Sequence, residues 1–199
     1  MSRFVVIEGL DGAGTTTQSA AIARALRAKG REVLTTREPS DGPIGKMIRQ
    51  ALTHALQMTP QTLALMFAAD RVDHVAREIE PALKRGAVVL SDRYLLSSLA
   101  YQGSQLPIGW VAAINSEARM PDLTLFLEID PDVAAKRRTV RGGKRELYET
   151  KAIQKRTAKQ YLAAIALRRK AGEKIVVIDG GAPMADVTAA ALKALGKKV

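Results

Sequence analysis

Residues 4–18 read FVVIEGLDGAGTTTQ, and this stretch decides the fold. The apolar, β-branched run at 4–8 indicates a buried strand. Residues 9–16 follow directly and match the P-loop pattern G-x-x-x-x-G-K-[ST] at every defined position except one, because Thr15 stands in place of the lysine. Glycines let backbone N–H groups turn toward phosphate oxygens, and the next helix adds the positive end of its dipole. The stretch therefore predicts a phosphate-binding loop between a strand and a helix, with the Thr16 hydroxyl placed to ligate Mg²⁺.

Outward from this loop, the chain alternates short apolar runs with longer helical patterns. Further strands are expected at 32–37, 87–90, 123–129 and 175–178. Helices are expected at about 16–29, 43–57, 60–85, 131–140, from the end of the loop at 141–148 to about 171, and at 183–195. Strands separated by helices imply βαβ units. The sequence thus predicts one α/β domain over 1–199, a three-layer P-loop fold whose five-stranded parallel sheet is flanked by helices.

The net charge of +11 is concentrated in one part of the chain. Residues 136–174 hold fourteen Lys or Arg against three Glu, which accounts for the whole excess. Such a segment can bind a small polyanion such as a triphosphate as readily as a nucleic acid. Aromatic residues make up only 4% and are not interleaved with the basic run, which disfavours a single-strand stacking platform. We therefore expect no nucleic-acid partner.

Other classes of protein are disfavoured by what the sequence lacks. There is no cysteine, so disulfides and thiolate metal sites are excluded. The two histidines, His54 and His74, are far apart in sequence, which disfavours a histidine metal cluster. No apolar stretch reaches the ~18 residues of a membrane span, and the N-terminal apolar run is too short for a secretory signal. The expectation is a cytoplasmic protein with no membrane partner.

Three further motifs carry charge or aromatic character. Arg37-Glu38-Pro39 ends the second predicted strand, where the arginine could hold a phosphate or belong to a surface turn. Phe67 and Arg71 are four apart and so share a helix face. A phenyl ring can stack on a base while a guanidinium reaches its exocyclic oxygen, although a core phenylalanine with arginine at its rim fits as well. Residues 88–94, VVLSDRY, resemble the apolar run ending in aspartate that supports magnesium in P-loop proteins.

Together these motifs resemble the thymidylate kinase family of nucleoside monophosphate kinases. They occur in the family's order across residues 4–130, and the later helix, lid loop and final strand follow the family plan. The matching elements are the glycine loop with Asp11, Arg37-Glu38-Pro39, Phe67 through Arg71, Asp92-Arg93-Tyr94, Ser97-Ser98, Tyr101-Gln102-Gly103 and Pro121-Asp122-Leu123. The resemblance implies transfer of the ATP γ-phosphoryl to dTMP with Mg²⁺, by a homodimer.

The resemblance also implies a role for each matching residue. Asp11 would hold the deoxyribose 3′-hydroxyl and help to fix magnesium, which Thr16 and Asp92 would place. The residues implied for dTMP are Arg37 and Arg93 on the monophosphate, Phe67 stacked on thymine, Arg71 at its O4, Ser98 and Gln102 beside the base, and Tyr101 against the sugar 2′ position. The residues implied for the ATP phosphates are Gly9, Leu10, Asp11, Gly12, Ala13, Gly14, Thr15, Thr16 and Thr17. One of Arg137, Arg138 and Arg141 would pack on adenine.

Two positions depart from the family pattern. Thr15 supplies no charge where the P-loop lysine reaches the β- and γ-phosphates. Leu147 stands where lids of the family, here at about 141–149, commonly carry an arginine. Our hypothesis is that Lys144 or Arg145 folds over the phosphates and acts in catalysis with Asp11 and Arg93; solvated loop charges are the alternative. A weak or inactive nucleotide-binding homologue, and a kinase for another nucleoside monophosphate, are the other functions that the sequence allows.

Overall fold

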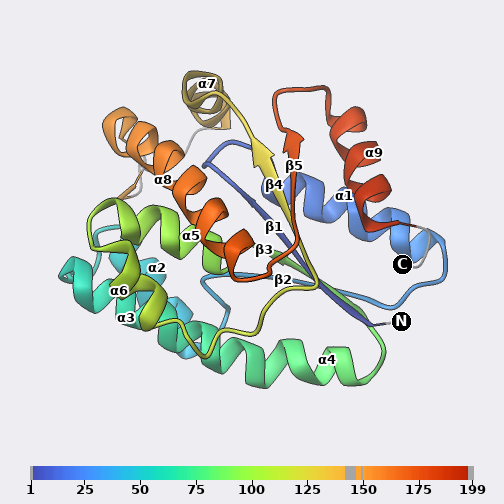
Figure 1. Ribbon diagram of the computed structural model, residues 1–199, viewed down its shortest axis with the longest axis horizontal. Coiled ribbons are helices and arrows are strands. Elements are labelled where there is room, and N and C mark those ends of the chain that lie inside the picture. Colours follow the sequence, from blue (N-terminus) through green and yellow to red (C-terminus); the bar gives the residue numbers. More distant parts are fainter. Residues whose placement is uncertain (1, 142–146, 149, 197–199) are drawn as a thin grey trace.

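The computed structural model describes residues 2–141, 147–148 and 150–196. Within them the strands form a five-stranded parallel sheet, as predicted (Figure 1). Its order is β2 (Val33–Arg37), β3 (Val88–Asp92), β1 (Arg3–Gly9), β4 (Leu123–Glu128) and β5 (Ile175–Asp179). Every residue of β1 after Arg3 is buried. A central parallel strand is covered on both faces, which explains its continuous apolar run.

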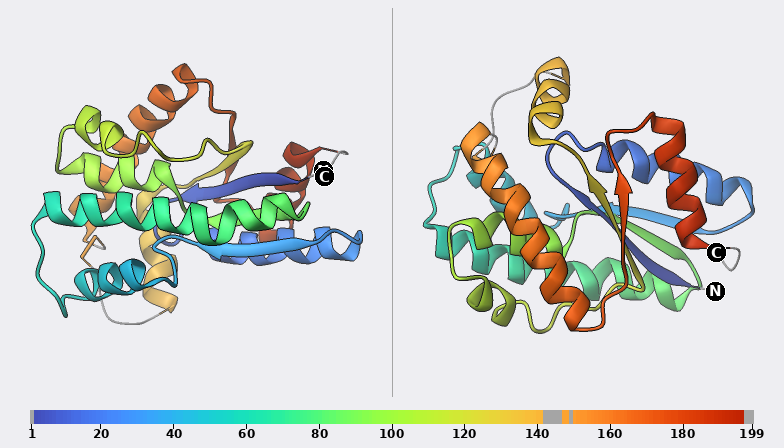
Figure 2. Two further views of the ribbon diagram at one scale, coloured as in Figure 1. Left: turned by 90° about the horizontal axis from the view of Figure 1, so that it is seen from below. Right: turned by 45° about the horizontal axis from the view of Figure 1, so that its top comes forward.

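Helices cover the two faces of the sheet in separate layers (Figure 1). The first layer is α1 (Thr15–Ala28) and α9 (Met184–Leu195). The second is α3 (Pro60–His74), the π-helix η1 (Val75–Ile79), α4 (Glu80–Lys84), α5 (Leu95–Tyr101) and α8 (Lys151–Lys170). The right-hand view of Figure 2 shows the same division. The predicted three-layer α/β fold is therefore confirmed.

The remaining helices lie outside these layers. They are α2 (Pro43–Leu52), the 3₁₀ turn η2 (Gln102–Ser104), α6 (Ile108–Ala113) and α7 (Pro131–Arg141). In Figure 1, α7 stands above the carboxyl end of β4. No described helix is both long enough and apolar enough to cross a membrane.

Four elements differ from the sequence prediction. The helix expected at 43–57 ends at Leu52, so its predicted end was wrong: His54 adopts a left-handed φ of 63°, which turns the next amides back onto Gln50 O. Helices α5 and α6 were not predicted. The helix expected at 60–85 begins with the predicted Thr59 cap, which accepts a hydrogen bond from Thr62 N at 3.1 Å, but its middle is the π-helix η1. Single π turns of this kind often mark functional sites.

The carboxyl ends of the strands bring the predicted motifs to one edge. Parallel pairing places Asp92 beside Ile7 of β1 and beside Arg37 of β2. The glycine loop leaves β1 at the same edge, two residues after Ile7. In open α/β sheets this edge is where ligands bind.

Candidate functional site

The glycine loop has the backbone that the sequence predicts. Gly12 and Gly14 adopt φ values of 92° and 93°, which side chains rarely tolerate. A Cβ on Gly12 would also lie 2.4 Å from Ala134 O, because α7 packs directly against the loop. Thr15 opens α1 and is buried. The first N–H groups of a helix have no partner within the helix, so the start of α1 offers the kind of donors that an anion site requires.

Thr16 and Asp92, which the sequence assigned to magnesium, are in contact. The Thr16 hydroxyl donates to Asp92 Oδ2 at 2.5 Å. The other carboxylate oxygen, Oδ1, is buried and has no hydrogen-bond partner among the described residues. Hard divalent cations such as Mg²⁺ take carboxylate and hydroxyl oxygens as ligands. The residues present therefore fit a bound Mg²⁺.

A cleft of about 680 Å³, here called the loop cleft, runs along the glycine loop. It is lined by residues 11–18 of the loop and α1, and by Arg37, Arg49, Arg93 and Arg137. Arg37 is 58% exposed and pairs with Asp41 at 2.9 Å. Arg49 was not predicted; its guanidinium donates to Pro39 O at 2.6 Å and so anchors the turn after β2. The cleft offers a polyanion an amide-lined loop and several cations.

The three arginines considered for the adenine site lie in different places. Arg137 donates to Gly180 O at 2.8 Å and lines the loop cleft near the end of β5. Arg138 instead donates to Asp11 O and braces the loop from outside. Arg141 is the last residue of α7. Lys144 and Arg145, the predicted lid cations, lie outside the described residues.

A second, smaller cavity of about 130 Å³ adjoins the cleft, and we call it the inner cavity. It gathers every residue expected to bind the monophosphate except Arg37, which lies only on the loop cleft. These are Asp11, Phe67, Arg71, Arg93, Ser98, Tyr101 and Gln102. The cavity is completed by Glu38, Pro39, Leu52, Tyr94, Ser97 and Tyr148. Phe67 and Arg71 therefore lie on the same side of α3, as predicted. The alternative, a buried phenylalanine with an exposed arginine beside it, is reversed in the structure: Arg71 is only 1% exposed and Phe67 is half-buried.

Arg93 stands between the two spaces and lines both. It donates to Asp11 Oδ1 at 2.6 Å and to Gly9 O at 2.8 Å, and its guanidinium lies 5.5 Å from the centre of the Tyr101 ring. Burial alone would lower the pKa of Arg93, but the facing groups, among them Tyr101 and Asp11, raise it above its ordinary value. Its φ of 71° is strained for a non-glycine residue, and such strain is common at functional sites. Arg93 is therefore a fixed, permanent cation.

Glu8, which the sequence did not single out, supports Arg93 from below. Its fully buried carboxylate accepts hydrogen bonds from Tyr94 N at 2.8 Å, Ser97 Oγ at 2.6 Å and Tyr161 Oη at 3.2 Å. Ser97 and Tyr161 in turn contact Arg93 Nη1. Burial raises the pKa of Glu8 to about 7. In the sequence Glu8 is simply the last residue of the predicted strand, and its contact with Tyr161 involves a residue much later in the chain, so no local pattern identifies it.

We expect Glu8→Gln to flatten the dependence of stability on pH. The carboxyl titrates near 4.5 in the unfolded chain but near 7 in the folded protein. The folded state therefore holds the proton more tightly, so the free energy of unfolding should fall as pH rises from about 4.5 to about 7, by on the order of 1–3 kcal/mol. Glutamine keeps an acceptor but does not titrate. Urea unfolding of both proteins at pH 5 and pH 7.5 measures this, and an equal pH dependence in the two would contradict it.

Comparison with known proteins agrees with this geometry. The family model described as "Thymidylate kinase" matches residues 7–191. A probable thymidylate kinase of Pyrobaculum calidifontis is 41% identical over 92% of this chain and 91% of its own length. A probable thymidylate kinase of Caldivirga maquilingensis is 45% identical over 71% of this chain and 70% of its own length. A probable thymidylate kinase of Methanococcus maripaludis (strain C7) is also 45% identical, over 83% of this chain and 78% of its own length. The chain therefore belongs to the thymidylate kinase family.

Proposed function

We propose that this protein transfers the γ-phosphoryl group of ATP to dTMP, giving dTDP and ADP. The observation that carries the proposal is a pair of unpaired polar atoms that belong to two residues lining the inner cavity. Arg71 Nε and Gln102 Oε1 are both buried, and neither has a hydrogen-bond partner among the described residues. One is a donor and the other an acceptor. They match the base edge of thymine, which offers an acceptor at O4 and a donor at N3–H, and they oppose cytosine, whose exocyclic amine is a donor.

The loop cleft would hold ATP, and the inner cavity would hold dTMP. A phosphate oxygen of dTMP attacks the γ-phosphorus, the bond from that phosphorus to the bridging oxygen breaks, and ADP leaves. Such a transfer depends mainly on positioning and charge neutralisation. Arg93, which lines both spaces, would neutralise the transferred group, while Arg37, which lines only the loop cleft, would bind the monophosphate from that side. A Mg²⁺ held by Thr16 and Asp92 would supply further neutralisation of the phosphate oxygens.

The rest of the inner cavity would position the nucleoside. Phe67 would stack on the base, with Ser98 beside it. Tyr101 Oη accepts a hydrogen bond from Asp11 N at 3.2 Å, and its ring lies 5.4 Å from that of Tyr148. These aromatic walls would crowd the 2′ position and favour deoxyribose, while Asp11 would bind the 3′-hydroxyl.

Further elements of the proposal rest on the family resemblance. A single domain would carry both substrates, and the protein would act as a cytoplasmic homodimer. Lys144 or Arg145 would supply a lid cation over the ATP phosphates. On this reading, replacing both by alanine lowers turnover.

The test is ADP release from ATP–Mg²⁺ in the presence of dTMP, dUMP, dCMP or AMP. We expect dTMP to give the highest kcat/KM. The value for dUMP should be lower by roughly tenfold, because only one methyl contact is lost. The value for dCMP should be lower by roughly 10–100-fold, because both polar contacts of the base are mismatched. Equal or faster turnover of dCMP or AMP would contradict the proposal, and so would binding of dTMP without turnover.

A further inference from the structure

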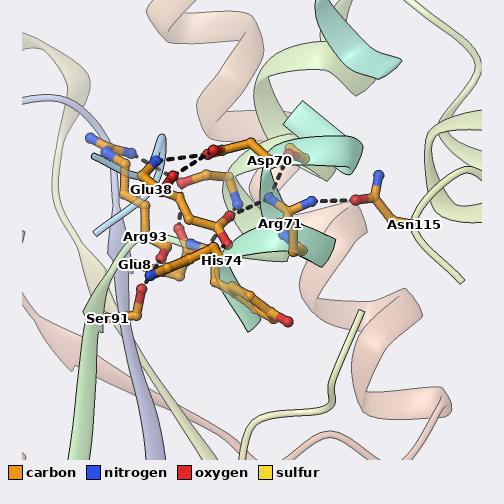
Figure 3. A network of polar contacts seen from close by, with 12 residues as sticks. Glu8, Glu38, Asp70, Arg71, His74, Ser91, Arg93 and Asn115 are labelled. Atoms are coloured by element: carbon orange, nitrogen blue, oxygen red, sulfur yellow. Dashed lines mark hydrogen bonds and ion pairs between the residues drawn. The ribbon is translucent and has the colours of Figure 1, made fainter. Parts of the chain in front are cut away.

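The base-reading arginine is buried and is held from several sides. Arg71 Nη2 donates to Glu38 Oε2 at 2.7 Å and to Ser98 Oγ at 3.0 Å. The Tyr94 ring lies under the guanidinium at 5.0 Å. Arg71 Nη1 donates to Asn115 Oδ1. Figure 3 shows Arg71 lying between Glu38 on one side and Asn115 on the other.

These contacts decide where the unpaired Nε–H points. A guanidinium is planar and presents its five N–H groups in a rigid fork. One anchored nitrogen leaves the plane free to pivot, but anchors on both Nη1 and Nη2 fix its direction. Glu38 supplies the first anchor and neutralises the buried charge. Asn115 supplies the second.

Asn115 is itself oriented so that only an acceptor faces Arg71. It follows α6 and is buried. Its Nδ2 donates to Val111 O at 2.9 Å, which turns Oδ1 toward the arginine. Asn115 does not line the inner cavity, so its effect on a ligand has to pass through Arg71.

Glu38, the anchor on the other side of Arg71, is itself held by a neighbouring side chain. His74 Nδ1 lies 3.3 Å from Glu38 Oε1, and His74 Nε2 lies 2.7 Å from Thr36 Oγ1. His74 directly precedes the π-helix η1. Glu38, however, lines the inner cavity, so a change there would alter the cavity wall as well as Arg71. Asn115 is the cleaner position at which to test the direction of the arginine.

We propose that Asn115 is a positioning residue that fixes the direction of Arg71 and thereby sets the preference for thymine over cytosine. The proposal rests on the proposed dTMP kinase function. Without the Asn115 anchor the guanidinium can pivot toward Glu38, and its Nε–H leaves the base edge. The chemistry at the glycine loop lies elsewhere, so the loss falls on KM for dTMP rather than on kcat.

The experiment measures kcat and KM with dTMP and dCMP for wild type and Asn115→Leu, with Ser116→Ala as the matched control on the exposed neighbour. We expect the dTMP-to-dCMP ratio of kcat/KM to fall roughly tenfold or more in Asn115→Leu, the scale of a hydrogen bond to a charged group. The fall should come through KM for dTMP. Asn115→Asp, which keeps an acceptor toward Arg71, should retain the ratio, and Ser116→Ala should not change it.

A second arm separates positioning from mere structural support. In an Arg71→Met background, Asn115→Leu should have no further effect on the base ratio, because the group it directs is gone. A ratio that is unchanged by Asn115→Leu alone, with only a lower melting temperature, would overturn the inference. If Asn115→Leu does not fold, Asn115→Ala carries the same expected fall in the ratio.

Failure of the proposed function gives a different pattern. Wild type would then release no ADP with dTMP. The inference is in that case tested by calorimetric binding of dTMP and dCMP. Tighter binding of dTMP by wild type, reduced in Asn115→Leu, supports it. Equal binding of the two nucleotides, or a preference that Asn115→Leu leaves intact, overturns it.

Discussion

Arg93→Met should lower kcat for dTMP phosphorylation by roughly 10³-fold, the scale of an arginine that neutralises a transferring phosphoryl group. Arg93 lines both the loop cleft and the inner cavity, and it is the cation at their junction. Its charge is held in place by Asp11 at 2.6 Å and by Gly9 O at 2.8 Å. Methionine fills a similar volume but carries no charge. The negative charge on the transferred phosphoryl group and the Asp11 carboxylate would then both lack a cationic partner.

A charge-conserving substitution shows whether the geometry of the Arg93 guanidinium matters in addition to its charge. Arg93→Lys keeps the charge but cannot span Asp11 and Gly9 O with a rigid fork, so we expect it to recover only a small part of the lost kcat. Arg24→Met, at an exposed position of α1, is the control and should leave kcat unchanged. Steady-state ADP release and the melting temperature of each variant measure this. A folded Arg93→Met protein whose kcat falls less than roughly tenfold would remove Arg93 from the mechanism.

The parts of this molecule that the sequence predicted are those governed by local rules. The strands were found because residues buried on both faces of a parallel sheet form continuous apolar runs. Gly12 and Gly14 were found because their positive φ values leave glycine as the natural choice. The rule that parallel strands end at one edge placed Asp92 near the glycine loop, and the family resemblance implied its shared role with Thr16, which it contacts.

The parts that the sequence did not predict depend on contacts between distant segments. The pKa of Glu8 is raised by burial, and part of its surroundings is Tyr161, which lies 153 residues away in the chain. Asn115 matters through Arg71, on a different helix. Helix α6 is only six residues long and has no pattern long enough to show a period. The reversed burial of Phe67 and Arg71 depends on Glu38, whose carboxylate makes a buried guanidinium tolerable.

Thr15→Lys should raise kcat/KM for ATP–Mg²⁺ by roughly 10–100-fold. Thr15 opens α1 beside Gly14 and lines the loop cleft, so a lysine there extends along the space that the phosphates would occupy. A charge-assisted hydrogen bond contributes about 1.5–3 kcal/mol, and each 1.4 kcal/mol is a factor of ten. KM for dTMP should change little, because the residue does not line the inner cavity.

The control for added charge is Ala20→Lys, which places the same cation on the exposed side of α1 and should not change turnover. A gain confined to Thr15→Lys shows that the loop lacks a charge that the arginines of the cleft do not replace. Arg93 lines both spaces and pairs with Asp11, Arg37 lines the loop cleft and pairs with Asp41, and Arg137 donates to Gly180 O. None of them is held against the start of α1. The absence of any gain would contradict this prediction. It would mean that the lid cation proposed at Lys144 or Arg145 already replaces the missing lysine in full, whereas we expect it to replace only part of that charge.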